Sequence, residues 1–597
     1  MTEDFSRKIG LGFYGIIAVF AVLCLRLWQL QVLQGDMYLQ LSENNRLRIL
    51  KTPAPRGIIY DRNRVSLVKN IPTFNVSINP DSLKDIDLDE LCSLLGLDKR
   101  EVEERLNRTD ASPFVPIRLR MGVSFEDVAH VEAMRSDFPG LFVETDVGRA
   151  YPFGKVGAHV IGYLGKITPV QLTRQELRSF PADTMIGQWG AEAMFDESLR
   201  GKPGERIVEV DALGRELRLI QQKPPVKGDD ITLSIDINIQ KAVEDAFGEK
   251  AGALVAIKPG SGEILALESL PSFDPNIFSG GISYSNWKTI MEDKKKPMLN
   301  RALQSRYPPG STFKIVTAIA ALEEGVIKPN EKVNCTGGIR YGKWFFGCWL
   351  KKGHGLVDFH RAIVESCDSY FYEMGRRLGI DRIYKYAVKL GLGRETGLMF
   401  APVKEETGLI PNTEWKKKTK HQPWFLGDTF ISAIGQGYVS ATPIQMAAMT
   451  AAVAADGRIY KPTLLKGDYN PVGEADLKLE NLELVKSAMA GVVNEPDGTA
   501  KGARSALAIV AGKTGTAQVV GKKKGSGAEK FMDHAWFIAF APEENPSIAL
   551  AVFVEHGGGG GAVAAPIAKK AIEACLKPAR PSVRKTADEE DTDNAEN

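Results

Sequence analysis

The sequence of 597 residues has almost no net charge. Its 76 lysines and arginines nearly balance 74 aspartates and glutamates, leaving a formal charge of +2 at pH 7. The charged residues are dispersed through the chain rather than massed in one region. A protein that binds nucleic acid usually has a basic patch or stripe. The composition therefore predicts that nucleic acid is not a partner.

Cysteines and long apolar runs are also scarce. The chain has six cysteines, which are too few for a disulfide framework in a protein of this size. The one long apolar run covers residues 9–25, and Arg26 is the only charged residue between positions 9 and 33. This pattern predicts a single transmembrane anchor over residues 9–33. A buried core helix is the alternative.

The flanks of this run predict its orientation. Arg7 and Lys8 precede it, so the excess of positive charge places residues 1–8 in the cytoplasm. A small-residue cleavage site does not follow the run, which favours a retained anchor over a signal peptide. Nearly all of the remaining chain is then expected outside the cytoplasmic membrane.

The length predicts two to four domains. Residues 34–228 contain short strand-like segments and glycine turns, with a helix-rich insert at residues 81–140. A Pro-Pro pair and a Lys-Gly-Asp-Asp turn mark a boundary at residues 221–230. Residues 229–576 have strand pairs at both ends and long helical stretches between them, which predicts an α+β domain built on one antiparallel sheet. The polar, acidic residues 577–597 are expected to be disordered.

Three short motifs in this second domain carry the chemistry. Ser311 and Lys314 form S-x-x-K, Ser366 and Asp368 form S-x-D, and Lys513 opens K-T-G. A serine nucleophile, a lysine base, a relaying serine and a cationic strand together make an acyl-transfer site. Each motif alone is common, but the three in this order are a specific signal of an acyl-transfer site.

The surroundings of Ser311 support this interpretation. A Pro-Pro-Gly sequence precedes it, and residues 313–322 are apolar on nearly every side, which predicts a buried helix with Ser311 at its start. Such a helix start offers N–H donors to an oxyanion. Lys314 shares a helix face with Ser311 and can accept its proton where it is desolvated. A capping serine and a surface lysine are the plain alternative.

The K-T-G motif predicts a substrate-binding strand. The hydroxyl groups of Thr514 and Thr516 and the ammonium group of Lys513 suit a substrate carboxylate, and Gly515 allows a close approach. The plain alternatives are an edge strand for this motif and a simple turn for Ser366.

A second group of residues has the side chains of a metal site. Cys335, Cys348, His354 and Cys367 lie within 33 residues and suit zinc, although their spacing matches no compact zinc-finger motif. Four protein ligands would make the site structural rather than catalytic. The alternatives are a Cys335–Cys348 disulfide and unrelated buried thiols.

The motif set resembles the serine penicillin-recognising transpeptidases. Other strings narrow the resemblance to class B penicillin-binding proteins over nearly the full chain. They are Arg-Gly-Ile-Ile-Tyr-Asp-Arg at 56–62, Arg-Ala-Tyr-Pro at 149–152, Ala-His at 158–159, Gly-Tyr at 162–163, Gly-Ala-Glu at 190–192, Leu-Arg-Gly at 199–201, Ile-Gly-Gln-Gly at 434–437 and Thr-Pro-Ile-Gln at 442–445. Most relatives have Asn where this chain has Asp368. The elongation branch of the class tolerates Asp, so the resemblance favours that branch over the division paralogue.

The resemblance implies D,D-transpeptidation of peptidoglycan in the periplasm by a protein anchored in the inner membrane. Ser311 would form an acyl-enzyme with a stem peptide, releasing terminal D-alanine, and β-lactams would acylate the same serine. No cofactor is needed for this chemistry, whereas the resemblance favours zinc at the Cys/His group. Implied partners are stem peptides, the nascent glycan made from lipid-linked precursor, and a membrane glycosyltransferase of the shape, elongation, division and sporulation kind.

Other functions remain open at this point. A carboxypeptidase or β-lactam hydrolase would use the same nucleophile with water, but it needs neither the anchor nor the roughly 200 residues before the catalytic domain. A β-lactam sensor would need more membrane spans, and a scaffold would not need the complete catalytic set. The chain contains no recognisable glycosyltransferase domain, so it is expected to cross-link glycan rather than polymerise it.

Overall fold

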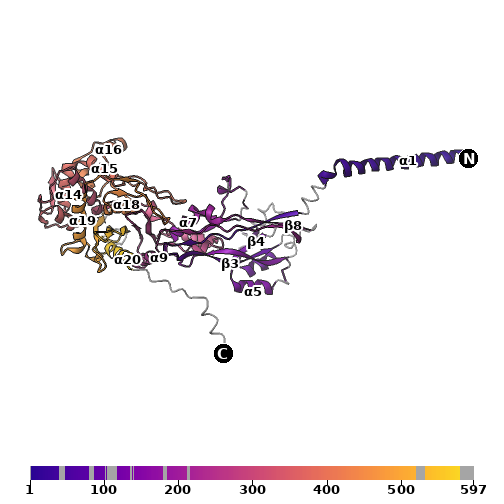
Figure 1. Cartoon of the computed structure of the whole chain (residues 1–597), viewed down its shortest axis with the longest axis horizontal. Helices are drawn as coiled ribbons and strands as arrows, with labels where there is room; N and C mark the ends of the chain where they lie inside the picture. Colours follow the sequence, from indigo (N-terminus) through magenta and orange to yellow (C-terminus); the bar gives the residue numbers. More distant parts are fainter. Residues whose placement is uncertain are drawn as a thin grey trace, which may run out of the picture. The chain divides into compact units, whose positions relative to one another are not determined.

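The computed structural model describes residues 2–38, 47–78, 86–97, 99–100, 102–103, 117–134, 137–138, 140–175, 177–178, 180, 184–210, 216–519 and 532–577. The chain divides into two compact units (Figure 1). Unit 1 comprises Met1–Gly57, Asn70–Gly148 and Glu197–Asp229, and unit 2 comprises Ile58–Lys69, Arg149–Asp196 and Asp230–Asn597. The predicted tail at 577–597 lies, apart from Lys577, outside the described residues.

Unit 1 begins with the apolar segment. Helix α1 (Thr2–Trp28) continues into a π-helical turn, η1 (Gln29–Leu33). Within the stretch Gly12–Leu33, a window of 18 residues has a mean hydropathy of 2.1 and no buried residue. It is long and apolar enough to cross a membrane. The structure thus has one N-terminal apolar helix where the sequence predicts the anchor.

The rest of unit 1 is rich in β-structure. One antiparallel sheet has the order β1 (Leu47–Thr52), β8 (Gly204–Val210) and β9 (Glu216–Lys223). In the other, β4 (Ile117–Val123) and β5 (Leu141–Ala150) both pair with β3 (Ser66–Ile78).

The predicted helical insert at 81–140 is of mixed structure. It contains α3 (Leu88–Leu95) and α5 (Phe125–Ala133), as expected, but also β4. The sequence Ile-Arg-Leu-Arg of β4 alternates apolar and polar residues, which is the signal of a strand with one buried face. The strand and both helices contribute to one apolar core that includes Leu91, Leu119 and Val131.

Unit 2 contains the predicted antiparallel sheet. Its order is β12-β11-β21-β20-β19. All neighbours are antiparallel, with bounds β11 (Gly252–Ile257), β12 (Ile264–Leu270), β19 (Ala511–Ala517), β20 (His534–Ala541) and β21 (Ile548–Val554). Every residue of β11, β12 and β21 is buried. A strand buried along its whole length is covered on both faces, so the sheet forms the centre of the unit.

Helices cover this sheet and hold the catalytic motifs. Helices α9 (Ile237–Phe247) and α20 (Ala564–Leu576) pack against each other and the sheet, and α18 (Pro443–Ala454) packs against β11, β20 and β21. Helix α12 (Lys314–Glu323) contacts α14 (Asp368–Leu378), α15 (Ile380–Lys389) and α19 (Leu479–Asn494). The other elements of unit 2 used below are β2 (Ile59–Tyr60), β13 (Val333–Cys335), β14 (Gly338–Tyr341), β15 (Trp344–Gly347), β16 (Gly355–Val357), α10 (Tyr284–Glu292), α13 (Phe359–Val364), α16 (Thr413–Lys420) and α17 (Leu426–Ala433).

Candidate active site

The candidate nucleophile lies on a tight turn before α12. The 3-10 helix η5 (Gly310–Phe313) carries Ser311, and α12 begins at Lys314. Ser311 is half-buried and Lys314 is fully buried. The predicted buried helix is therefore present, with Ser311 on the 3-10 turn that leads into it.

Three glycines let the chain pack tightly around Ser311. Gly310 has φ of 56°, and its N–H donates to the carbonyl of Gly435 at 2.9 Å. A Cβ atom at Gly310 would lie 2.6 Å from the carbonyl oxygen of Thr516, and one at Gly515 would lie 2.8 Å from that of Pro309. Any larger residue at these positions would push the nucleophile away from β19.

Ser366 lies at a break between two helices. Helix α13 ends at Val364 and α14 starts at Asp368. Ser366 has φ of 56°, a left-handed conformation that interrupts a helix. The break turns Ser366 and Asp368 toward Lys314, whose Nζ donates to Ser366 O at 2.9 Å, to Ser366 Oγ at 3.2 Å and to Asp368 Oδ1 at 2.7 Å.

Lys513 reaches the same serine from β19. Its Nζ donates to Ser366 Oγ at 2.8 Å and to the carbonyl of Thr514 at 3.1 Å. Burial, followed by the positive charge of Lys314, holds the pKa of Lys513 well below its usual value, although Asp368 opposes this shift. The structure thus brings Lys314, Ser366, Asp368 and Lys513 into one buried network, which we call the lysine cluster.

Three further contacts of these residues were not predicted from the sequence. The N–H of Trp349 donates to Asp368 Oδ2 at 2.9 Å. The hydroxyl of Thr499 lies 2.8 Å from that of Thr514, and the Gln436 side chain donates to the Thr516 carbonyl at 2.9 Å. Only Gln436 belongs to a motif noted in the sequence. Trp349 and Thr499 have no motif that could have revealed them.

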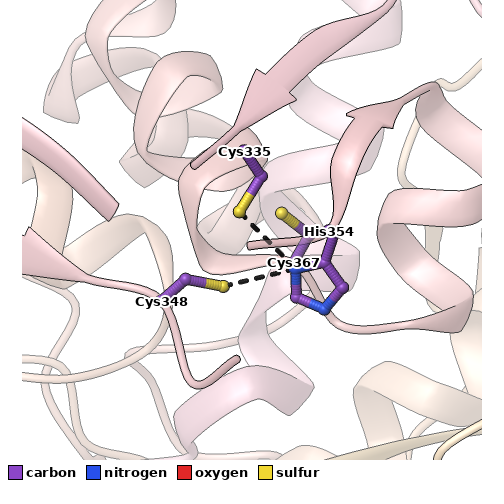
Figure 2. A group of neighbouring side chains, drawn as sticks. All are labelled: Cys335, Cys348, His354 and Cys367. Atoms are coloured by element: carbon purple, nitrogen blue, oxygen red, sulfur yellow. Dashed lines mark hydrogen bonds between the residues drawn. The ribbon is translucent and has the colours of Figure 1, made fainter. Parts of the chain in front are cut away.

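The four predicted metal ligands form a buried group beside this network (Figure 2). Their ligand atoms all lie within 4.8 Å of one another. His354 Nδ1 is 3.5 Å from Sγ of Cys335 and 3.5 Å from Sγ of Cys348. Cys335 and Cys348 are free thiols, so the alternative Cys335–Cys348 disulfide is not formed. We call Cys335, Cys348, His354 and Cys367 the thiol cluster.

The chemistry of the thiol cluster fits a zinc ion. Three thiolates and one imidazole nitrogen are an established structural zinc set. His354 Nε2 is buried without a hydrogen-bond partner among the described residues and lies 3.9 Å from Glu365 Oε2. A metal at Nδ1 would fix the proton on Nε2, and this N–H faces the Glu365 carboxylate as its acceptor.

Comparison with known families identifies both parts of the chain. Residues 252–573 match the Penicillin binding protein transpeptidase domain, and residues 51–233 match the Penicillin-binding Protein dimerisation domain. Peptidoglycan D,D-transpeptidase MrdA of Haemophilus influenzae is 34% identical, and the match covers 97% of this chain and 93% of that protein. The chain belongs to the penicillin-binding protein 2 family. It is a serine-type peptidoglycan D,D-transpeptidase that binds penicillin.

Solved structures of the family have the same fold. The complex between penicillin-binding protein 2 and MreC from Helicobacter pylori aligns with a TM-score of 0.78 at 30% identity, covering 88% of this chain and 99% of that one. A solved structure of a peptidoglycan synthase complex, which addresses the structural coordination of polymerization and crosslinking, aligns with a TM-score of 0.71 at 32% identity. The alignment covers 96% of this chain and 99% of that one. The predicted α+β arrangement on one antiparallel sheet is confirmed, and this sheet has five strands.

Proposed function

We propose that Ser311 is the nucleophile of a transpeptidation that proceeds through an acyl-enzyme. Its Oγ attacks the carbonyl carbon of the penultimate D-alanine of a stem peptide, the peptide bond breaks, and terminal D-alanine leaves. The amine of a second stem peptide then attacks the ester and releases the serine. The backbone N–H groups of Ser311 and Thr516 would stabilise the oxyanion, because such donors favour the charge that develops there.

The lysine cluster would move the protons. Lys314 takes the proton of Ser311 and passes it across the 3.2 Å contact to Ser366, which protonates the leaving amine. Asp368 orients Lys314 through the 2.7 Å contact. Lys513, with its lowered pKa, exchanges a proton with Ser366 across 2.8 Å. The contacts that join Lys314, Ser366 and Lys513 are the observation that carries this proposal.

The K-T-G strand would hold the free carboxylate of the substrate. Thr514 and Thr516 offer hydroxyl groups, Lys513 offers N–H donors, and Gly515 leaves room for the substrate backbone. Thr514 is nearly buried, and its contact with Thr499 fixes its hydroxyl group. A β-lactam would present its carboxylate to the same groups.

Intact-mass analysis of the full-length protein after incubation with a β-lactam tests the nucleophile. We expect one slowly decaying adduct on the wild type and on Ser285→Ala, a matched change at an exposed serine, and none on Ser311→Ala. An adduct on Ser311→Ala would refute the assignment. Rapid turnover without a lasting adduct would favour a carboxypeptidase or β-lactam hydrolase.

The N-terminal helix would anchor the protein in the inner membrane. Its 22-residue apolar stretch, with Arg7 and Lys8 before it, supports a single pass with residues 34–576 in the periplasm. Residues 34–228 would form a pedestal for partners and residues 229–576 the transpeptidase domain. The related complexes with MreC and in a peptidoglycan synthase support a role in elongation beside a membrane glycosyltransferase.

The thiol cluster would hold one structural zinc ion through three sulfur atoms and His354 Nδ1. Four protein ligands leave no open position, so the ion would stabilise the segment that carries Ser366 rather than react. Zinc content of the full-length protein, measured by native mass and elemental analysis, tests this. We expect about one ion per chain, retained in Cys92→Ser and lost in Cys348→Ser. A metal-free wild type that is fully folded and acylated would refute the site.

A further inference from the structure

Two consecutive residues, Gly435 and Gln436, contact both sides of the candidate active site. The Gly435 carbonyl accepts the N–H of Gly310 at 2.9 Å, and the Gln436 side chain donates to the Thr516 carbonyl at 2.9 Å. Gly310 precedes Ser311 on η5, whereas Thr516 belongs to β19. One dipeptide therefore bridges the turn that carries the candidate nucleophile and the K-T-G strand.

The dipeptide is held in place by its surroundings. Gly435 has φ of 72°, and a Cβ atom there would lie 2.3 Å from the carbonyl oxygen of Gly310. The hydroxyl of Thr317, which is buried in α12, donates at 2.8 Å to the carbonyl of Ala433 at the end of α17. These contacts fix the backbone from which the Gln436 side chain starts relative to α12, the helix that follows Ser311.

Gln436 reaches β19 on the edge that faces the nucleophile. Strand β19 is the last one in the order of the five-stranded sheet. In an antiparallel strand the N–H and the carbonyl of one residue point to the same side, so the Thr516 N–H lies on the edge that Gln436 contacts. A Cβ atom at Gly310 would lie 2.6 Å from the oxygen and 3.2 Å from the nitrogen of Thr516, which places this edge beside the Ser311 turn.

The bridge therefore joins the two structures that supply the oxyanion donors of the proposed function. One N–H belongs to Ser311 on the turn, and the other belongs to Thr516 on the strand. Both donors must lie within hydrogen-bond distance of the same oxygen atom, because their effect depends on geometry that is set before the reaction. A link that fixes the spacing of the turn and the strand favours the reaction without touching the substrate.

We propose that Gln436 is a positioning residue, which keeps the N–H groups of Ser311 and Thr516 at the spacing that the oxyanion requires. Its amide holds the edge of β19, while the neighbouring Gly435 holds the nucleophile turn. This inference rests on the proposed transpeptidase function and adds to it a residue that acts through the two donors.

The rate of acylation by a chromogenic cephalosporin, measured by stopped flow on the full-length protein, tests the proposal. Gln436→Met keeps the length of the side chain but removes its N–H donors. We expect acylation to slow about 10–30-fold, because the oxyanion donors lose their alignment. Gln188→Met is the matched control and should react like the wild type. Gln188 is also half-buried and donates to a backbone carbonyl, that of Lys166 at 3.1 Å, outside the candidate active site.

The infrared spectrum of the acyl-enzyme separates positioning from a general loss of structure. A hydrogen bond to an ester carbonyl lowers its stretching frequency, and a β-lactam that is isotope-labelled at the lactam carbonyl identifies this band. We expect the band of Gln436→Met at a higher frequency than the bands of the wild type and Gln188→Met. Only acylated molecules contribute to the band, so an unfolded fraction does not obscure the comparison.

Two outcomes would overturn the inference. Gln436→Met is acylated as fast as Gln188→Met, or it is acylated slowly while its carbonyl band stays at the wild-type frequency. The second result would assign Gln436 to substrate entry or to general stability. Acylation of the wild type alongside either result leaves the proposed function intact, whereas a wild type that cannot be acylated at all would refute the transpeptidase site itself.

Discussion

Two buried clusters meet at residues 365–368, and they differ in whether each of their polar groups has a hydrogen-bond partner. Each group of the lysine cluster has a hydrogen-bond partner, and Lys314 forms an ion pair with Asp368. The thiol cluster gathers three sulfur atoms around one imidazole whose Nε2 has no partner among the described residues. The lysine cluster is complete in protein atoms, whereas the thiol cluster leaves one buried imidazole nitrogen without a hydrogen-bond partner among the described residues.

The difference shows how one short segment can serve both clusters. Ser366 and Asp368 face the lysines, while Cys367 between them belongs to the thiol cluster. An ordered ion on one side would fix the position of the proton-carrying groups on the other. The two clusters should therefore respond differently to mutation, chelation and pH.

Removal of Lys314 should have the largest effect. In Lys314→Ala, the nearly buried Asp368 carboxylate loses its ion-pair partner, which costs about 3–5 kcal/mol of stability. Loss of the general base should also slow β-lactam acylation about 10³-fold. Denaturant unfolding and stopped-flow acylation measure the two effects.

Lys416→Ala is a matched control for this change. Lys416 is also buried and forms an ion pair with Asp428, but it lies in α16 and outside the lysine cluster. The Lys416→Ala variant should lose about as much stability as Lys314→Ala, while the fraction of it that is folded should keep the wild-type acylation rate. Equal loss of acylation in both variants would contradict a specific chemical role for Lys314.

Disruption of the thiol cluster should have a smaller effect on the chemistry. Cys367→Ser, or removal of metal by a chelator, should loosen the segment that carries Ser366 and slow acylation about 10–100-fold. The chelator should have no further effect on Cys367→Ser, and Cys92→Ser should behave like the wild type. If chelation slowed the wild type and Cys367→Ser equally, the thiol cluster would not be its target.

Asp368→Asn should have a modest effect. The amide oxygen can still accept from Lys314, but the amide N–H₂ would then face the N–H of Trp349, donor against donor. We expect a loss of about 1–3 kcal/mol in stability and a moderate fall in acylation rate. Asp428→Asn controls for the loss of an ion pair elsewhere in unit 2, and the two variants are compared by thermal unfolding.

The sequence predicted the side chains of both clusters, because the chemistry demands particular residue types in a fixed order. The structure brings Lys314, Ser366, Asp368 and Lys513 together and puts Ser311 on the turn before α12, while the catalytic roles of these residues stay predictions. The central sheet was also predictable, since β11 and β21 are continuous apolar runs bounded by turn residues.

Other features depend on contacts between distant parts of the chain and could not be predicted. The positive φ of Ser366 has no residue signal, because glycine usually marks that conformation. Trp349 and Thr499 act through a backbone N–H and a hydroxyl brought to Asp368 and Thr514 by folding. Unit 2 is assembled from separate stretches of the chain for the same reason. Its strand β2 pairs with β10 (Ile231–Thr232), which lies about 170 residues further along the chain and also belongs to unit 2.

The smallest predicted effect is a change in how stability depends on pH, and it concerns the buried amine of Lys513 in the lysine cluster. The pKa of Lys513 is lowered in the folded protein, so the unfolded chain binds a proton that the folded chain has released between that lowered value and the ordinary 10.5. Stability from this group therefore rises with pH across that window and is lost as pH falls. Lys513→Met should remove this rise, and urea unfolding of the wild type and variant at several pH values measures it. Cys92→Ser leaves Lys513 and its surroundings in place and should keep the rise, because burial and the charge of Lys314 lower the pKa of Lys513.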